Sequence, residues 1–256
     1  MARHLKILIP HGMQYSYLNL IPLLNKFENN SQFSEICLYH AYEPPKIRGK
    51  AMPQTLKDLM DDDEKTIKNF LNNQAEIMSK LLKSDTKIKT SVRKNRPVQG
   101  IKVKIKKYKP DILMMTTQNH MGISKFINSS NALKLLNQID IPILILPQDY
   151  KFKKDIRLNF LIQHFENYEL AKELSKGFKD IFDDIRFIHR DPDKKKKTTK
   201  DIKVVSSIED YIKKSKNDEV FMLIRKKKGK LQSALSKGFV DRLLGLNQAP
   251  VIIVNQ

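Results

Sequence analysis

The stretch Ile141-Pro142-Ile143-Leu144-Ile145 closes the first half of the chain, and Ala249-Pro250-Val251-Ile252-Ile253-Val254 closes the second half. Both are short apolar runs rich in Ile, Leu and Val, which is typical of strands buried on both faces of a parallel sheet. An acid-led apolar run precedes each of them, at residues 111–115 and 218–224. The end of each half therefore predicts two neighbouring buried strands.

The beginnings of the two halves match as well. An apolar run ends in His11 near the start of the chain, and a second one ends in His164. Together with the closing stretches, this makes three matched landmarks in the same order, which indicates a diverged internal duplication. We predict two domains, residues 1–150 and 151–256, with the second one truncated.

Strands and helices are expected to alternate along both domains. In the first domain, strands are expected at 5–10, 36–42, 88–92, 111–116 and 141–146, and helices at 16–27, 56–83 and 98–109. In the second, strands are expected at 156–163, 185–189, 219–224 and 250–254, and helices at 167–183, 207–214 and 233–245. The composition of residues 193–200 predicts an exposed linker, which takes the place of the long helix at 56–83. The alternation predicts an α/β fold with a mostly parallel sheet flanked by helices in each domain.

Composition limits the classes of protein to consider. The 256 residues include 48 Lys and Arg against 28 Asp and Glu, a formal net charge of +20, and 40% of them are hydrophobic, which excludes a disordered chain. A single cysteine, Cys37, excludes an intrachain disulfide and a Cys-based zinc site, and the histidines show no metal-binding spacing. No signal peptide or membrane-spanning run is visible. We expect a cytoplasmic protein that binds neither metal nor membrane.

The chain resembles a tandem member of the universal stress protein family. Residues 7–10, 36–45, 111–115 and 141–145 carry the resemblance in the first half, and residues 218–254 carry it in the second. It implies two Rossmann-like domains of the adenine nucleotide alpha hydrolase type, each with a five-stranded parallel sheet, packed as a pseudo-dimer through their last strands. It also implies a role in stress adaptation, through a small ligand or a protein partner, and leaves a homodimer open.

ATP-binding members of that family carry Gly-x-x-Gly, nine residues, and then Gly followed by Ser or Thr after the fourth strand. Glycines allow the backbone to approach the phosphates, which backbone amides near a helix N-terminus then bind. The matching positions in the first half are Thr116, Asn119, Ser129 and Ser130, and in the second half Arg225, Lys228, Gly238 and Phe239. Only Ser130 and Gly238 fit the pattern, so the usual ATP site is expected to be lost. ATP or AMP binding with slow hydrolysis is kept as an alternative.

A ligand in such a sheet is expected at the carboxyl ends of the strands. The candidate site in the first half consists of Pro10, His11, Gly12, Ala41, Thr116, Asn119, Ser129 and Ser130. The second-half equivalents are His164, Arg225, Lys228 and Gly238. The recurrence of His11 and His164 at one strand end makes them the best candidates for ligand contacts, but a structural cap on the strand end is the favoured interpretation. No catalytic constellation is present, so we expect no enzyme.

The positive charge supports a second hypothesis, a basic module that binds nucleic acid or another polyanion. The basic runs are Lys194–Lys197, Arg225–Lys228 and the set Lys102, Lys104, Lys106 and Lys107. Few aromatic residues lie among them, although single-strand binders use such residues for stacking. A lysine-rich surface set by the composition of the source genome remains the alternative explanation.

Overall fold

The structure is a computed structural model. It describes the following residues: 5–12, 18–30, 33–43, 54–83, 86–117, 135–136, 138–147, 150–152, 155–162, 167–179, 181–182, 184–191, 201–215, 218–225, 239, 242–243, 246 and 249–255.

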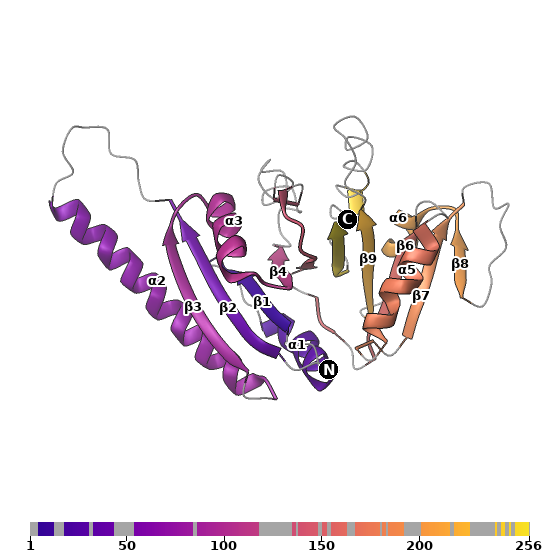
Figure 1. Cartoon of the computed structure of the whole chain (residues 1–256), viewed down its shortest axis with the longest axis horizontal. Helices are drawn as coiled ribbons and strands as arrows, with labels where there is room; N and C mark the ends of the chain where they lie inside the picture. Colours follow the sequence, from indigo (N-terminus) through magenta and orange to yellow (C-terminus); the bar gives the residue numbers. More distant parts are fainter. Residues whose placement is uncertain are drawn as a thin grey trace.

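Strands and helices alternate in both halves, as expected (Figure 1). The first half contains β1 (Leu5–Pro10), η1 (Leu18–Leu20), α1 (Ile21–Asn30), β2 (Phe33–Tyr42), α2 (Gln54–Leu81), β3 (Lys87–Lys94), α3 (Pro97–Tyr108), β4 (Ile112–Thr117) and β5 (Ile143–Pro147). The second half contains β6 (Arg157–Ile162), α5 (Tyr168–Ser175), η3 (Lys176–Phe178), β7 (Asp184–Arg190), β8 (Ile202–Val205), α6 (Ile208–Lys213), β9 (Glu219–Arg225) and β10 (Val251–Asn255).

All ten strands form one sheet in the order β3-β2-β1-β4-β5-β10-β9-β6-β7-β8. Each half thus has the strand order 3-2-1-4-5 of a doubly wound fold, with parallel pairing inside the half. The closing strands β5 and β10 pair antiparallel, with Leu144 opposite Ile252. Consequently the last strands join the two halves, and β3 and β8 form the edges of the sheet.

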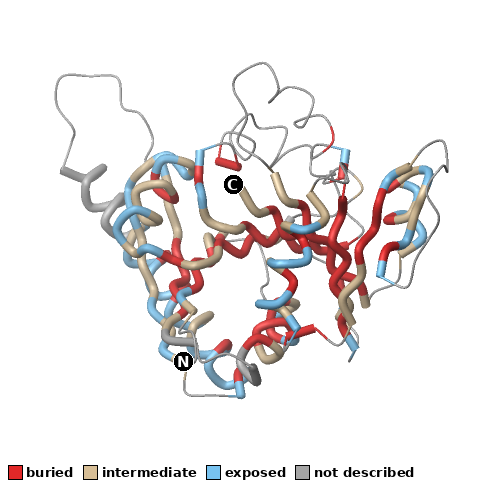
Figure 2. The backbone as a smooth tube through the Cα atoms, turned by 45° about the vertical axis from the view of Figure 1, so that its right-hand side comes forward, coloured by how far each residue is buried: buried red, intermediate tan, exposed pale blue. Residues whose placement is uncertain are grey.

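The core follows the strands (Figure 2). All of β5 and most of β6 are buried, because helices cover the sheet on both faces. The long helix α2 packs mainly on β3 and α3 packs on β2. Thr90 of β3 hydrogen-bonds to Asn72 of α2, whereas the odd-numbered residues of β2 face α3. The two helices therefore lie on opposite faces of the sheet. The connection through α2 moves outward from β2 to β3, and the connection through α3 moves back from β3 to β4, so two right-handed crossovers place their helices on different faces.

Two expectations for the second half need correction. The sequence reading missed β8, a four-residue strand that pairs with β7 at the edge of the sheet. Its run Ile202-Lys203-Val204-Val205 is short and contains a lysine, so hydrophobicity alone does not separate it from the preceding linker. The helix expected at 167–183 ends at Ser175 and continues as η3 around Gly177, since glycine weakens helix propagation.

The second half is shorter because it has no counterpart of the long helix α2 between its second and third strands. A helix of 28 residues, α2, connects β2 to β3, whereas only residues 191–201 separate β7 from β8. A segment that short cannot contain a helix like α2. All five strands of the half are nevertheless retained.

Candidate functional site

The order of strands places a candidate site at the ends of β1 and β4. The strands following β1 along the chain lie on one side of it, and β4 and β5 lie on the other. At such a reversal the connections leave in opposite directions and open a crevice at the carboxyl ends of the strands. A cavity of about 130 Å³ lies at this point. We call it the strand-end cavity; Pro10, His11, Gly12, Tyr39, His40, Ala41, Pro97, Ile101, Met115 and Thr116 line it.

Five of the eight residues expected in the first-half site come together at this cavity. They are Pro10, His11, Gly12, Ala41 and Thr116. The other three, Asn119, Ser129 and Ser130, lie outside the described residues, as do His164, Lys228 and Gly238 of the second half. Arg225 ends β9 opposite Asn255 of β10, and the structure describes none of the other second-half candidates beside it.

His11 is held in place from several directions. Its backbone N–H donates to the Tyr39 carbonyl oxygen at 2.7 Å, and its ring lies 5.2 Å from the Phe70 ring of α2. Only 5% of the residue is exposed. Burial, with a smaller effect from nearby His40, lowers the pKa of His11 to about 3. The imidazole is therefore neutral at physiological pH.

A histidine hydrogen bond that the sequence reading missed occurs in both halves. Nδ1 of His40 in β2 lies 2.5 Å from the carbonyl oxygen of His11, and Nδ1 of His189 in β7 lies 3.2 Å from that of Ile162. A carbonyl oxygen can only accept, so each Nδ1 carries the hydrogen and donates it. The two second strands thus cap the ends of the two first strands alike. The sequence signal was a histidine near the end of each second strand. The repeated hydrogen bond favours a structural role for His40 and His189.

A close contact fixes the wall between the cavity and α3. A Cβ atom built on Gly100 would lie 2.7 Å from Ala41 Cβ and 2.7 Å from the Tyr39 hydroxyl oxygen. Only glycine allows the first turn of α3 to approach β2 this closely. Gly100 therefore sets the distance between the helix and the strand ends, although it belongs to no motif of the sequence.

A second and larger cavity opens on the α3 side of β2 and β3. It has a volume of about 440 Å³, and we call it the basic groove. Glu35, Cys37, Tyr39, Lys89, Thr90, Ser91, Val92, Arg93, Lys104, Lys107 and Tyr108 line it. Tyr39 also lines the strand-end cavity, so a single side chain contributes to both.

Among the described residues, no group of three or more His, Cys, Asp or Glu side chains is placed to hold a metal ion. Within the same part of the chain, no helix is both long enough and apolar enough to span a membrane.

No protein-family model and no curated protein sequence matches this chain. Solved structures do resemble it. The chain is similar to a universal stress protein from Archaeoglobus fulgidus, with a TM-score of 0.70 and 13% identity over 98% of this chain and 96% of that one. It is also similar to a protein of unknown function from Pseudomonas aeruginosa, with a TM-score of 0.63 and 11% identity over 98% and 92% of the two chains. It is similar as well to a protein from Pseudomonas aeruginosa described as a universal stress protein, with a TM-score of 0.61 and 11% identity over 98% of this chain and 92% of that one.

The strand order and these similarities together define the fold. A doubly wound parallel sheet with strand order 3-2-1-4-5 in each half belongs to the Rossmann-like α/β class. Within that class, the structure has the fold of the universal stress proteins, here with two such units in one chain.

Proposed function

We propose that this chain is a non-catalytic stress-response protein of the cytoplasm that acts by binding a small, neutral ligand in the strand-end cavity. One observation carries the proposal: the described residues that line this cavity include no Lys, Arg, Asp or Glu. The lowered pKa keeps His11 neutral as well. No fixed charge of these residues thus faces the ligand. The stress role comes from the resemblance to the universal stress proteins.

The size of the cavity also favours a ligand smaller than ATP. Sites for cofactors and drug-sized ligands usually measure about 300–1,000 Å³, whereas a cavity of about 150 Å³ accepts a molecule such as benzene. At about 130 Å³, the strand-end cavity belongs with the second kind. Thr116 lines it at the position where ATP-binding members have their first glycine. Both features support loss of the usual ATP site.

The histidines at the cavity are poorly suited to acid–base catalysis. A general base works best when its pKa lies near the working pH, and the pKa of His11 is lowered to about 3. Nδ1 of His40 is engaged with the His11 carbonyl oxygen. This arrangement supports binding rather than turnover.

The experiment is a titration of the full chain, monitored by protein-observed NMR, with pyrimidine, phenol, AMP and Mg²⁺–ATP at physiological salt. We expect the two neutral ring compounds to shift the signals of Gly12 and Thr116. Thr116→Leu, which adds volume at the half-buried rim, should abolish these shifts. The matched control is Thr90→Leu, on β3 and outside the strand-end cavity.

Two results would overturn the proposal. In the first, neither ring compound shifts these signals in the wild-type chain. In the second, Mg²⁺–ATP binds at micromolar concentration in physiological salt and is slowly hydrolysed, which would establish the nucleotide alternative.

Within the described part of the chain, the polyanion alternative gains support from the basic groove. The four lysines of α3 fall into two groups. Lys104 and Lys107 line the basic groove, and Lys102 and Lys106 line a different cavity together with Gln138. Lys194–Lys197 and residues 226–228 lie outside the described residues. The described lysines therefore do not form one stripe of the kind that follows a nucleic-acid backbone, and the basic groove is considered by itself below.

A further inference from the structure

The basic groove exists because α3 leaves one face of β3 uncovered. The connection from β2 to β3 runs through α2 on one face of the sheet, and the connection from β3 to β4 runs through α3 on the other. Helix α3 packs on β2 rather than on the edge strand β3. Alternate residues of β3, namely Lys89, Ser91 and Arg93, therefore face the groove beside α3.

Charge in the groove is strongly unbalanced. Four cationic side chains, Lys89, Arg93, Lys104 and Lys107, line it with one carboxylate, Glu35. Glu35 forms an ion pair with Lys89. Burial raises the pKa of Glu35, but hydrogen bonding and the charge of Lys89 outweigh burial and lower it, so this carboxylate stays ionised and bound to Lys89.

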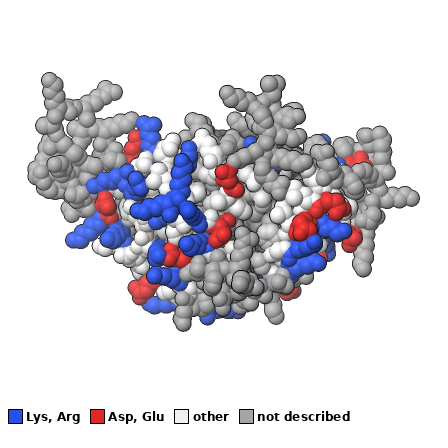
Figure 3. Space-filling model, viewed as in Figure 1, with Lys and Arg blue, Asp and Glu red and all other residues white. Residues whose placement is uncertain are grey.

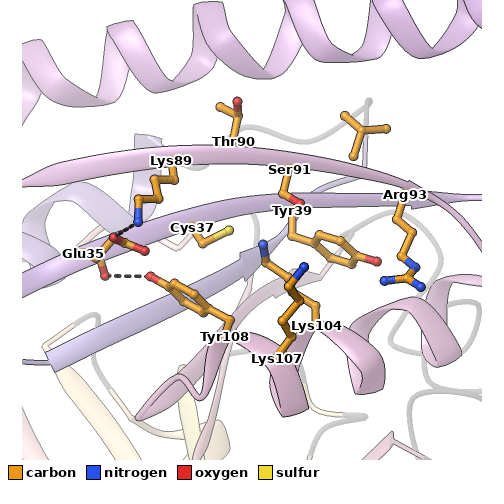
Figure 4. A pocket seen from close by; sticks show the side chains of 11 residues that line it. Glu35, Cys37, Tyr39, Lys89, Thr90, Ser91, Arg93, Lys104, Lys107 and Tyr108 are labelled. Atoms are coloured by element: carbon orange, nitrogen blue, oxygen red, sulfur yellow. Dashed lines mark hydrogen bonds and ion pairs between the residues drawn. The ribbon is translucent and has the colours of Figure 1, made fainter.

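The other three cations have no carboxylate partner among the described residues (Figure 4). The ammonium nitrogen of Lys104 lies 5.4 Å from the centre of the Tyr108 ring and 5.8 Å from that of Tyr39. Burial raises the pKa of the Cys37 thiol, so this group adds no negative charge. Beyond the pair of Glu35 and Lys89, the groove thus retains an excess of positive charge that no described carboxylate balances.

A solvated lysine surface does not explain this arrangement. On α3, Lys104 and Lys107 share one helix face with Tyr108, and in Figure 4 their side chains point toward the sheet rather than away from it. Figure 3 shows Lys and Arg side chains gathered over α3 and the neighbouring strands. A lysine whose only role is solubility needs no position between two tyrosine rings.

The Tyr39 hydroxyl provides an independent observation. Tyr39 is 1% exposed, yet its hydroxyl has no hydrogen-bond partner in the described part of the chain. Burying a hydroxyl without a hydrogen-bond partner is energetically costly. In Figure 4 it points to the side of the groove where the Arg93 guanidinium lies. An anion held by Arg93 would supply the missing acceptor.

We infer that the basic groove is a binding site for a small molecule that carries two or more phosphate groups. Its volume lies within the usual range for small-ligand sites. Lys89 and Arg93 are four residues apart on one strand face, about 13 Å, and Lys104 and Lys107 are about one helix turn apart. Several linked phosphates can contact cations across such a span, and a single phosphate cannot. This site is separate from the strand-end cavity and does not depend on the function proposed for it.

A nucleic acid fits the groove less well. Single-strand binders offer free aromatic faces along a groove that follows the backbone. Here Lys104 covers the two tyrosine rings, and α3 closes one side. The compact shape therefore favours a small phosphorylated molecule.

The test is calorimetric titration of the full chain with inorganic tripolyphosphate, and separately with inorganic phosphate, at pH 7.5 in low and physiological salt. We expect tripolyphosphate to bind at physiological salt with one site per chain, and phosphate to bind far more weakly. Arg93→Gln combined with Lys107→Gln should weaken tripolyphosphate at least about tenfold, since charge-assisted hydrogen bonds to phosphate are lost. Lys102→Gln combined with Lys106→Gln is the matched control, because it removes the same charge from the same region but not from the groove.

Two further variants sharpen the test. Tyr39→Phe should weaken tripolyphosphate binding severalfold without lowering the thermal midpoint, because the described part of the chain gives the hydroxyl no hydrogen bond to lose. Thr116→Leu should leave tripolyphosphate binding unchanged, because Thr116 lines the strand-end cavity and not the basic groove. Failure at this site is thus distinguishable from failure of the proposed function.

Three outcomes would overturn the inference. One is an equal loss of affinity in the two double variants, which would show diffuse attraction to a positively charged chain. Another is binding of tripolyphosphate that disappears at physiological salt. The third is tight binding of a single-stranded RNA oligomer that resists Arg93→Gln combined with Lys107→Gln, with no binding of tripolyphosphate.

Discussion

The two halves of this chain share their strand order but bury their polar side chains in different places. In the first half, His11 lies at the carboxyl end of β1 beside the strand-end cavity, and Tyr39, in the later part of β2, lines both cavities. In the second half, His189 is buried near the carboxyl end of β7, but Asn159 is buried in the middle of β6 and Glu219 at the amino end of β9. Polar groups at the carboxyl ends can meet a ligand, whereas those in the middle or at the amino ends act on stability. The two halves thus retain the same backbone arrangement, and they differ in which polar groups they place at the carboxyl ends of the strands.

The largest expected effect concerns the amino ends of the second-half strands. Arg157 contacts Asp184 at 2.8 Å and Glu219 at 3.4 Å, and Glu219 is only 5% exposed. Arg157→Leu would remove the ion pair of the buried Glu219 carboxylate and leave it the Tyr211 hydroxyl at 3.5 Å, so we expect the free energy of unfolding to fall by about 3 kcal/mol in urea titrations at pH 7.

The first half offers a matched control for that change. Asp111 Oδ2 accepts a hydrogen bond from the backbone nitrogen of Lys6 at 2.8 Å in an exposed position. Asp111→Asn should therefore lower stability by no more than about 1 kcal/mol. An Arg157→Leu loss as small as the Asp111→Asn loss would contradict the contrast between the two amino ends. Adding Glu219→Gln to Arg157→Leu should recover part of the loss.

Next in size is the close approach of α3 to β2. Gly100→Ala would normally stabilise a helix by about 1 kcal/mol, but its Cβ would meet Ala41 Cβ and the Tyr39 hydroxyl at 2.7 Å. We expect a net loss of about 2 kcal/mol by urea titration, and weaker ligand binding at both cavities. In the second half, a Cβ on Gly177 would meet nothing within 4 Å, so Gly177→Ala should be neutral or slightly stabilising. Equal effects at the two glycines would refute this difference.

Acid should destabilise the first half through His11. Its pKa is about 3 in the folded chain against 6.5 in the unfolded chain, so between these values the unfolded state binds the proton. Stability from this group is therefore complete above pH 6.5 and is lost as pH falls, by about 2 kcal/mol at pH 5. Unfolding curves at pH 7.5 and pH 5 should differ less for His11→Gln than for the wild type. An equal change between the two pH values in the wild type and in His11→Gln would show that the pKa of His11 is not lowered in the folded chain.

The smallest expected effect is a gain in stability. Asn159 is fully buried, and neither its Nδ2 nor its Oδ1 has a hydrogen-bond partner in the described part of the structure. Asn159→Leu replaces an unsatisfied amide by an apolar group of similar shape, and we expect about 1 kcal/mol of added stability by thermal unfolding. Phe160→Leu on the same strand is the control and should destabilise. A loss of stability in Asn159→Leu would mean that the amide is satisfied.

Much of the fold followed from local sequence patterns. The apolar runs at residues 5–10 and 219–224 coincide closely with β1 and β9, because a strand covered on both faces must be apolar throughout. The edge strand β8 was missed, because an edge is only partly covered and four residues carry little pattern. At the candidate site, Pro10, His11, Gly12, Ala41 and Thr116 were found from their place at strand ends, and the structure brings them to one cavity. Gly100 and Tyr39 were not found.

The sequence by itself determined the alternation of strands and helices, the duplication and the pairing of the two closing strands that the resemblance implied. Only the tertiary structure decided that Tyr39 lines two cavities, that Gly100 sets the approach of α3, and that three cations of the basic groove have no carboxylate partner among the described residues. The physical reason is that periodicity along a chain reports which face of an element is buried. It does not report which helix covers that face, nor how far the cover extends, because those contacts join residues that are distant in sequence.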